Sequence, residues 1–222
     1  MDELIHAFFN WPILKESMPL LIQGLWVTIK LSFFSIVFGI ILGLILAVLR
    51  TLNVKLLNFF IVIYLDFMRA MPLLVLLVFV YYALPYLGIT LKPYPAGILT
   101  FTMISSAYVA EIFRSGIEAT PKGQMEAARS IGMNYFQAMR FIILPQALKI
   151  VIPPLTNNSI NVLKDTSLAS VIALPELLKQ AQQIQAWKAN PTPLIGATLL
   201  YLLLLIPLVK LANKLEKRMS PK

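Results

Sequence analysis

Long apolar runs, separated by short polar stretches, follow one another along most of this chain. A membrane-spanning helix needs about 20 mainly apolar residues to cross about 30 Å of hydrocarbon. The fourth run is the least uniform, because Asn, Lys and Asp residues interrupt it. The pattern predicts an all-α integral membrane protein that forms a single transmembrane domain over residues 1–222. We expect five transmembrane helices, at about residues 20–49, 56–84, 95–113, 150–172 and 193–212.

The composition agrees with a membrane location. Hydrophobic residues make up 59% of the chain and charged residues 13%, whereas soluble domains have about 45–50% apolar and about 25% charged residues. The chain has no cysteine and one histidine, which excludes thiol catalysis, disulfides and cysteine-based metal sites. We therefore predict no catalytic residue and no metal site.

The basic residues indicate how the chain is oriented. Cytoplasmic loops of membrane proteins are enriched in Lys and Arg, and this bias, together with anionic lipid headgroups as partners, accounts for the net charge of +9 without nucleic acid. The opposite face has only Lys15, Lys92, Lys179 and Lys188. We expect the amino terminus outside and the carboxyl terminus inside. The basic face comprises Arg50, Lys55, Arg114, Lys122, Arg129, Arg140, Lys149, Lys210, Lys214, Lys217, Arg218 and Lys222.

The longest predicted cytoplasmic loop, about residues 119–145, has the signals of two short helices. Thr120 can cap the first helix, Pro121 suits its first position, and Gly132 can end it in the left-handed conformation. A second helix is expected to start at Asn134 and to stop before Pro145. The loop therefore predicts a short helix that lies outside the membrane.

This loop resembles the Glu-Ala-Ala loop of the permease subunits of bacterial ATP-binding-cassette (ABC) importers. Flanking segments at 64–73, 107–117 and 164–168 resemble the polar amino acid branch, the histidine, arginine and glutamine permeases, although Ala70 stands where that branch often has Gly. The resemblance extends over about residues 17–215. The matching loop residues are Glu126, Ala127, Ala128, Gly132, Ile142, Leu144 and Pro145.

The resemblance implies the type I ABC importer permease fold in a multi-pass protein of the cell membrane. Its short loop helix would be a coupling helix that docks on a cytoplasmic ATP-binding subunit through Glu126, Ala127, Ala128 and Gly132. It also implies a second permease subunit, identical or homologous, two ATP-binding subunits and an extracytoplasmic solute-binding protein. The plainer alternative is that the alanines only favour a helix and that Glu126 pairs with Arg129.

The energy for transport that the resemblance implies must come from ATP hydrolysis by a partner subunit. No glycine of this chain is followed by lysine, so the phosphate-binding Gly-x-x-x-x-Gly-Lys-Ser/Thr loop is absent from it. We expect a chain that is not an enzyme and binds no cofactor, with ATP and Mg²⁺ held by a separate subunit. Gly39 and Gly43 form a Gly-x-x-x-Gly pair that permits close helix contact, either within the chain or between two chains.

Ionisable residues inside the predicted spans are the candidates for a substrate pathway, because charges at membrane depth normally face a protein interior or water. Asn158, Asn161 and Asp165 follow i, i+3, i+7 spacing and should share one helix face. Glu111 either pairs with Arg114 or faces a cavity. The full set of candidate pathway residues is Glu111, Asp66, Arg69, Asn158, Asn161, Lys164 and Asp165.

Two of these candidates could also have a purely structural role. Asp66 and Arg69 are three residues apart on a helix and could neutralise each other. If Glu111 faces the pathway, it supplies a carboxylate for a cationic side chain, so we expect a basic amino acid such as arginine, lysine or histidine as substrate. The alternatives are a glutamine or glutamate permease of the same class and, from a different class, a self-sufficient secondary carrier, which usually has paired repeats and more spans.

Overall fold

The computed structural model describes residues 8–52 and 54–219, and within these ranges the chain is helical with no β-strand. Most of the helices are long, whereas π and 3-10 turns, labelled η, interrupt or extend some of them. The elements in chain order are α2 (Trp11–Arg50), α3 (Lys55–Ala70), α4 (Leu73–Val78), η1 (Phe79–Ala83), η2 (Leu84–Leu87), α5 (Pro93–Glu118), α6 (Lys122–Ser130), α7 (Tyr135–Ala138), η3 (Met139–Ile143), α8 (Leu144–Asp165), η4 (Thr166–Ile172), α9 (Leu177–Lys188) and α10 (Thr192–Met219).

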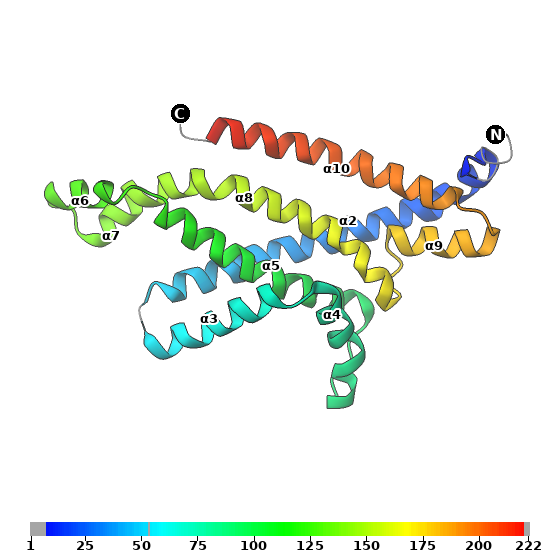
Figure 1. Ribbon diagram of the computed structural model, residues 1–222, viewed down its shortest axis with the longest axis horizontal. Helices are drawn as coiled ribbons and strands as arrows, with labels where there is room; N and C mark the ends of the chain where they lie inside the picture. The colour runs from blue at the N-terminus through cyan, green and yellow to red at the C-terminus, as the bar shows by residue number, and fades with distance from the viewer. Residues whose placement is uncertain (1–7, 53, 220–222) are drawn as a thin grey trace.

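The long helices run back and forth along one axis of the molecule (Figure 1). Helices α6 and α7 lie together at one end, and α9 lies at the other end beside the start of α2 (Figure 1). Four helical segments of the described residues are long and apolar enough to span a membrane, and the bent pair α3 with α4–η2 gives a fifth if it counts as one span. The four are Trp11–Arg50, Pro93–Glu118, Tyr135–Ile172 and Thr192–Met219.

The second predicted span is not the single helix expected over residues 56–84. The helix breaks after Ala70, and the direction of the chain bends by 104° between Lys55–Ala70 and Leu73–Leu87. Pro72 explains the break, because its ring disfavours the helical conformation of the preceding residue and it has no N–H to donate. Met71 accordingly has φ −75° and ψ 126°, in the extended region. Figure 1 shows α4 turning away from the direction of α3.

The sequence predicted that the second loop helix stops before Pro145, and this prediction is wrong. The helix continues through the π turn η3 into α8, so that Tyr135–Ile172 forms one long helical segment. A π turn has one extra residue, and here Leu144 N–H donates to the carbonyl of Met139. The same arrangement occurs at η1, which precedes Pro85. In both places the widened turn accommodates a proline that would otherwise break the helix.

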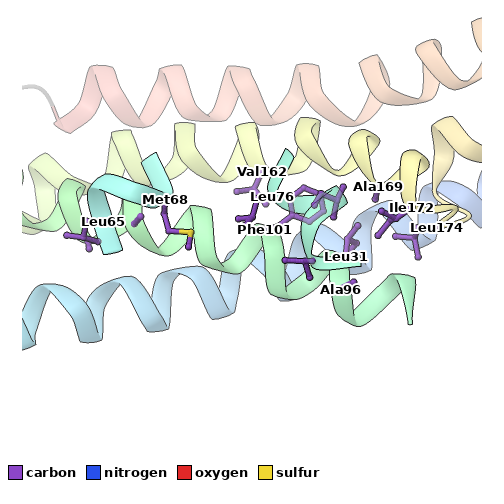
Figure 2. Packing of buried hydrophobic residues seen from close by; sticks show 14 of the residues in the cluster. Leu31, Leu65, Met68, Leu76, Ala96, Phe101, Val162, Ala169, Ile172 and Leu174 are labelled. Carbon is purple, nitrogen blue, oxygen red and sulfur yellow. The ribbon is translucent and has the colours of Figure 1, made fainter. Parts of the chain in front are cut away.

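Helix α5 lies at the centre of the packing and contacts α2 along much of its length. A Cβ added to Gly39 would lie 2.6 Å from Ser105 Oγ, and one added to Gly43 would lie 2.6 Å from Val109 Cβ. The Gly-x-x-x-Gly pair therefore makes a contact within the chain. Figure 2 shows buried hydrophobic residues of the core, with Leu31 from α2 and Phe101 from α5 among them.

A smaller apolar cluster attaches α9 to the rest of the molecule. Leu177, Ala181 and Ile184 of α9 are buried against Leu21 of α2 and Ala197 of α10. The apolar stripe of this short helix thus packs against protein, which fixes α9 at the end of the bundle where α2 begins and α10 starts.

Candidate functional site

A cavity of about 380 Å³ lies between α4, α5 and α8. Its volume is in the range of about 300–1,000 Å³ that is usual for small-molecule sites. Ser105 and Tyr108 lie near the middle of α5, a helix of 26 residues, so the cavity opens at mid-span rather than at an end. Its lining residues are Leu73, Phe101, Ile104, Ser105, Tyr108, Asn158, Asn161, Val162 and Asp165.

The polar side of this cavity comes from one face of α8. Asn158, Asn161 and Asp165 all line it, as their spacing predicted. Asn158 Nδ2 donates a hydrogen bond of 3.0 Å to Ser105 Oγ on α5. Between the described residues we find no hydrogen bond or ion pair that involves the side chain of Asn161 or Asp165. Their polar atoms are therefore available to a ligand.

The break in the second span shapes another wall. Leu73, the first residue of α4, lines the cavity. The first hydrogen bond of this helical turn is donated by Leu76 N–H to the carbonyl of Pro72, at 3.1 Å. Backbone amides at the start of a helix have no carbonyl one turn earlier to bind. The kink at Pro72 thus places the first residue of α4 in the wall of the cavity.

Glu111 lies outside this cavity, in a cluster of arginines. Arg114 donates from Nε to Glu111 Oε1 at 2.9 Å, and its Nη2 contacts the same oxygen. Arg50 Nη1 lies 3.4 Å and Arg69 Nη1 lies 3.8 Å from Glu111 Oε2. Arg114 also pairs with Glu118. The cluster joins the ends of α2, α3 and α5.

This cluster decides between the alternatives left open for three residues. Glu111 pairs with Arg114 and does not line the cavity. Among the described residues Arg69 pairs with Glu111 and not with Asp66, so the alternative that Asp66 and Arg69 neutralise each other does not hold. Asp66 is exposed, as is Lys164, and neither lines the cavity. Of the predicted pathway residues, the structure brings Asn158, Asn161 and Asp165 to the cavity, and it pairs Arg69 with Glu111 outside it.

The loop helix α6 begins one residue later than predicted, with Pro121 rather than Thr120 at its N-cap. Thr120 is buried, and its hydroxyl donates back to the carbonyl of Gly116. At the other end Gly132 has φ +87°, as predicted, and Met133 N–H donates to the carbonyl of Ala128 at 3.2 Å. This 6→1 bond closes a Schellman motif, in which glycine avoids a steric penalty.

The two alanines of the loop have different surroundings. Ala128 is buried against the rest of the loop, whereas Glu126 and Ala127 are exposed. Beyond the helix, Ile131 is 75% exposed and Phe136 is 71% exposed. One end of the molecule therefore presents a thin helix face with large apolar side chains beside it, an arrangement that suits a protein partner.

Ser105 and Tyr108 are the polar cavity residues that the sequence analysis missed. Ser105 stands next to Ser106 on α5, and Gly39 of α2 leaves room for it. Small residues on a helix indicate close contact with a neighbour, but they do not say which side chain reaches a cavity. In residues 8–52 and 54–219, no group of three or more His, Asp or Glu side chains could hold a metal ion.

The chain matches known proteins over most of its length. The family model of the binding-protein-dependent transport system inner membrane component matches residues 39–221. The probable glutamine ABC transporter permease protein GlnP of Bacillus subtilis (strain 168) is 40% identical over 211 residues, which cover 93% of this chain and 96% of that protein. The L-cystine transport system permease protein TcyB of the same organism is 37% identical over 213 residues, covering 95% of this chain and 91% of that protein.

A solved structure is similar in both sequence and fold. It is described as the crystal structure of an amino acid ABC transporter with histidines, and it matches with a TM-score of 0.87 and 37% identity over 91% of this chain and 95% of that chain. Since the family model and these relatives cover nearly the whole sequence, the chain belongs to the binding-protein-dependent transport system inner membrane components, the permease subunits of ABC transporters.

Proposed function

We propose that this chain is the membrane-spanning subunit of an ATP-driven importer for polar amino acids, and that the cavity between α4, α5 and α8 binds the substrate. The observation that carries the proposal is a mid-span cavity with a carboxylate and two carboxamides on one wall, Asp165, Asn158 and Asn161. Polar groups inside a span are costly unless they serve a partner or a pathway. A polar solute that crosses the membrane is such a partner.

The polar groups suit an amino acid zwitterion. The α-ammonium group needs an anion, and Asp165 is the one carboxylate among the residues that line the cavity. The α-carboxylate needs hydrogen-bond donors, and the side-chain amide of Asn161 supplies them. A zwitterion can therefore be held at both of its charged groups.

The side chain of the substrate is the finer question. The expectation of a basic amino acid rested on Glu111 as a second carboxylate, but three arginines surround that group. With Asp165 used by the α-ammonium, the described cavity has no further carboxylate for a cationic side chain. We therefore propose an uncharged polar side chain such as that of glutamine, with arginine, lysine and histidine as the competing class.

The loop end of the molecule would transmit the energy of ATP. We propose that α6 docks on a cytoplasmic ATP-binding subunit through exposed Glu126 and Ala127, with Ile131 and Phe136 at the rim. Docking there places the amino-terminal end of α2 and α9 on the outer face, toward a solute-binding protein. A second permease subunit and two ATP-binding subunits would complete the importer.

The test compares neighbouring asparagines of α8. Asn158 lines the cavity, whereas Asn157 is exposed and does not. The complete importer would be purified from native membranes, reconstituted in proteoliposomes, and assayed for uptake of labelled glutamine. We expect Asn158→Ala to reduce uptake at least about tenfold, through loss of a partly buried hydrogen-bonding group, and Asn157→Ala to leave it near the parent rate.

Competition distinguishes the two substrate classes. An excess of unlabelled arginine, lysine or histidine should compete poorly with labelled glutamine. Strong competition by the basic amino acids would instead support the cationic class. If Asn157→Ala and Asn158→Ala behave alike, the cavity is not the substrate site.

A further inference from the structure

The last helix, α10, lies at the edge of the bundle, away from α3 and α4 (Figure 1). It contacts α2, α8 and α9, so one side of α10 faces the protein and the other side faces outward. The outward side of its uncharged part, residues 193–209, has large apolar side chains. Leu203 is 72% exposed, and Leu199 and Ile206 are half-exposed. In a membrane-spanning helix, such a side is suited to lipid acyl chains.

The same outward side becomes basic where the uncharged part of α10 ends. Lys210, Lys214 and Lys217 follow i, i+4, i+7 spacing, which places them on one face of the helix. All three side chains are exposed. Counting back from Lys210 in steps of four and three residues leads to Ile206 and Leu203. One exposed face of α10 therefore changes from apolar to basic at Lys210.

The three lysines, which we call the basic stripe, have no acidic partner within residues 8–52 and 54–219. We find no ion pair or hydrogen bond there that involves their side chains. Glu216 is the one acidic residue of α10, but it is adjacent to Lys217 and two residues from Lys214, and side chains at those spacings do not face each other. The positive charges of the stripe are thus available to an anion.

The helix dipole does not explain the whole stripe. Basic residues stabilise the carboxyl end of a helix mainly within its last turn. Lys217 and Arg218 belong to the last turn of α10, whereas Lys210 and Lys214 precede it. The first two lysines of the stripe therefore need another explanation.

The basic stripe has a length that suits the headgroup layer of a bilayer. Lys210 and Lys217 are seven residues apart, which is about 10 Å along a helix that rises about 1.5 Å per residue. The headgroup layer on each side of the hydrocarbon is about 5–7 Å thick. Because lysine side chains are long and extend their ammonium groups toward the polar layer, all three can reach lipid phosphates.

We propose that this face of α10 binds anionic phospholipids, with acyl chains along Leu203 and Ile206 and headgroup phosphates at the basic stripe. A phospholipid has an apolar part followed by a phosphate, in the same order along the membrane normal as the two parts of this face. The inference requires that α10 spans the membrane, but it does not depend on the cavity being the substrate site. Each basic residue beside an anionic leaflet strengthens the attraction by about 1 kcal/mol, or about fivefold.

The test measures which lipid lies beside the basic stripe. A single cysteine replaces Leu211, which is 51% exposed and next to Lys210, in a chain that has no native cysteine. The complete importer, whose partner subunits are made free of cysteine, is labelled there with a fluorophore and placed in phosphatidylcholine nanodiscs. The nanodiscs also contain phosphatidylglycerol or phosphatidylcholine with a nitroxide on the acyl chain, at equal mole fractions. The readout is the ratio of quenching by the two nitroxide lipids.

We expect phosphatidylglycerol to be preferred at least about fivefold at low salt. The preference should approach one at 1 M salt, where charges are screened beyond about 3 Å. Changing the stripe as a whole, with Lys210→Gln, Lys214→Gln and Lys217→Gln together, should also bring the ratio close to one. Since these side chains are exposed, the substitutions leave the packing of α10 intact.

A matched control removes the same charge elsewhere on the basic face. Lys55→Gln, Lys122→Gln and Lys149→Gln together change three exposed lysines outside α10, and the preference at Leu211 should stay near the parent value. An equal loss in both triple variants would mean that net charge alone attracts the lipid, and the site would be wrong. Equal quenching by both lipids in the parent would show a lipid-facing surface that does not recognise the headgroup. If neither lipid quenches, an ATP-binding subunit or a second permease subunit covers this face, and the lipid assignment is overturned.

Discussion

Two polar regions lie one helical turn apart along α5, and they differ in whether their carboxylate has a partner within the protein. Around Glu111 every acceptor faces a guanidinium, from Arg50, Arg69 or Arg114. Beside Tyr108 the cavity has a carboxylate, Asp165, with no hydrogen bond or ion pair to another described side chain. From the sequence the two regions look alike, since both are charges inside apolar runs. A charge in a span therefore indicates a ligand site only where the fold supplies no partner for it.

The physical difference lies in what compensates the cost of the charge. Ionised groups at membrane depth are unfavourable unless they are paired or hydrated. In the arginine cluster the compensation is internal, and it ties α2, α3 and α5 to one another. In the cavity it must come from water or from a zwitterionic substrate. The arginine cluster should therefore govern stability, and the cavity should govern binding.

The largest effect on stability is expected when the arginine cluster loses the negative charge of Glu111 at its centre. Glu111→Gln keeps the shape and removes the charge, leaving Arg50, Arg69 and Arg114 to repel one another. Breaking an ion pair that is mostly buried costs about 3–5 kcal/mol, and since these side chains are 23–39% exposed we expect on the order of 2 kcal/mol. The thermal unfolding midpoint of the purified complex measures this loss.

A matched control for Glu111 is Glu118, whose side chain is 62% exposed and, among the described residues, forms an ion pair with Arg114 alone. Glu118→Gln should lower the midpoint much less. Because the effect of Glu111→Gln is on the fold, uptake per folded complex should change equally for glutamine and arginine. A selective loss of arginine uptake with an unchanged midpoint would restore Glu111 to the substrate pathway.

The next effect tests the cavity. Asp165→Asn removes the one carboxylate that lines it, so substrate affinity should fall at least about tenfold, through loss of a charge-assisted hydrogen bond. The unfolding midpoint should stay within a few degrees of the parent. Lys164→Gln is the control, because Lys164 is adjacent in sequence but exposed and outside the cavity. A large drop in midpoint for Asp165→Asn would show that this carboxylate has a structural role like that of Glu111.

A third effect separates binding from coupling. Gly132→Val forces a β-branched residue to φ +87°, at a cost of about 1–2 kcal/mol, and should distort the end of α6. We expect transport and substrate-stimulated ATP hydrolysis to fall several-fold while substrate affinity stays unchanged. Gly123→Val is the control, since Gly123 also has open space around it but no positive φ. Equal losses in both variants would mean that the turn at Gly132 is not what matters.

Much of the fold could be predicted from the sequence, because hydropathy and helix signals are local. The apolar runs indicated the long helices, and Gly132 marked the end of the loop helix. The errors were at prolines. Pro72 divides a span in two, whereas Pro145 interrupts nothing, because the π turn before it makes room for the ring. Pro153 and Pro154 also lie inside α8 without breaking it, so the presence of a proline in the sequence does not by itself decide where a helix ends.

For the candidate site, the spacing of polar residues along a helix predicted which of them share a face, but the sequence did not predict the ion-pair partners. The spacing of Asn158, Asn161 and Asp165 placed them on one face of α8, and the structure brings them to one cavity. The partner of Glu111 at i+3 was visible as an alternative, but Arg50 lies 61 residues away in sequence. Contacts between residues so far apart in the sequence depend on how the helices pack. The sequence therefore could not predict that three arginines surround the Glu111 carboxylate.

A third carboxylate, that of Glu176, lies at the end of the molecule where α9 is found. Glu176 caps α9 and is fully buried. Its carboxylate accepts from Leu178 N–H at 2.9 Å, from Lys179 N–H at 2.6 Å and from the Tyr201 hydroxyl at 2.8 Å. Like Glu111, and unlike Asp165, it has its partners within the chain. We therefore expect it to affect stability and not substrate binding.

The smallest effect is a pH dependence from Glu176, whose pKa is raised above its usual value by burial, a shift that its hydrogen bonds only partly oppose. A raised pKa means that the folded state favours the protonated form, so the contribution of this group is fully present below the usual pKa and is lost as pH rises through the raised one. Glu176→Gln keeps a neutral side chain at every pH. The difference in unfolding midpoint, parent minus variant, should therefore decrease as the pH rises from 5 to 8. Substrate affinity should be the same for both proteins at each pH, and a difference that grows with pH would show that the carboxylate form is the one the fold stabilises.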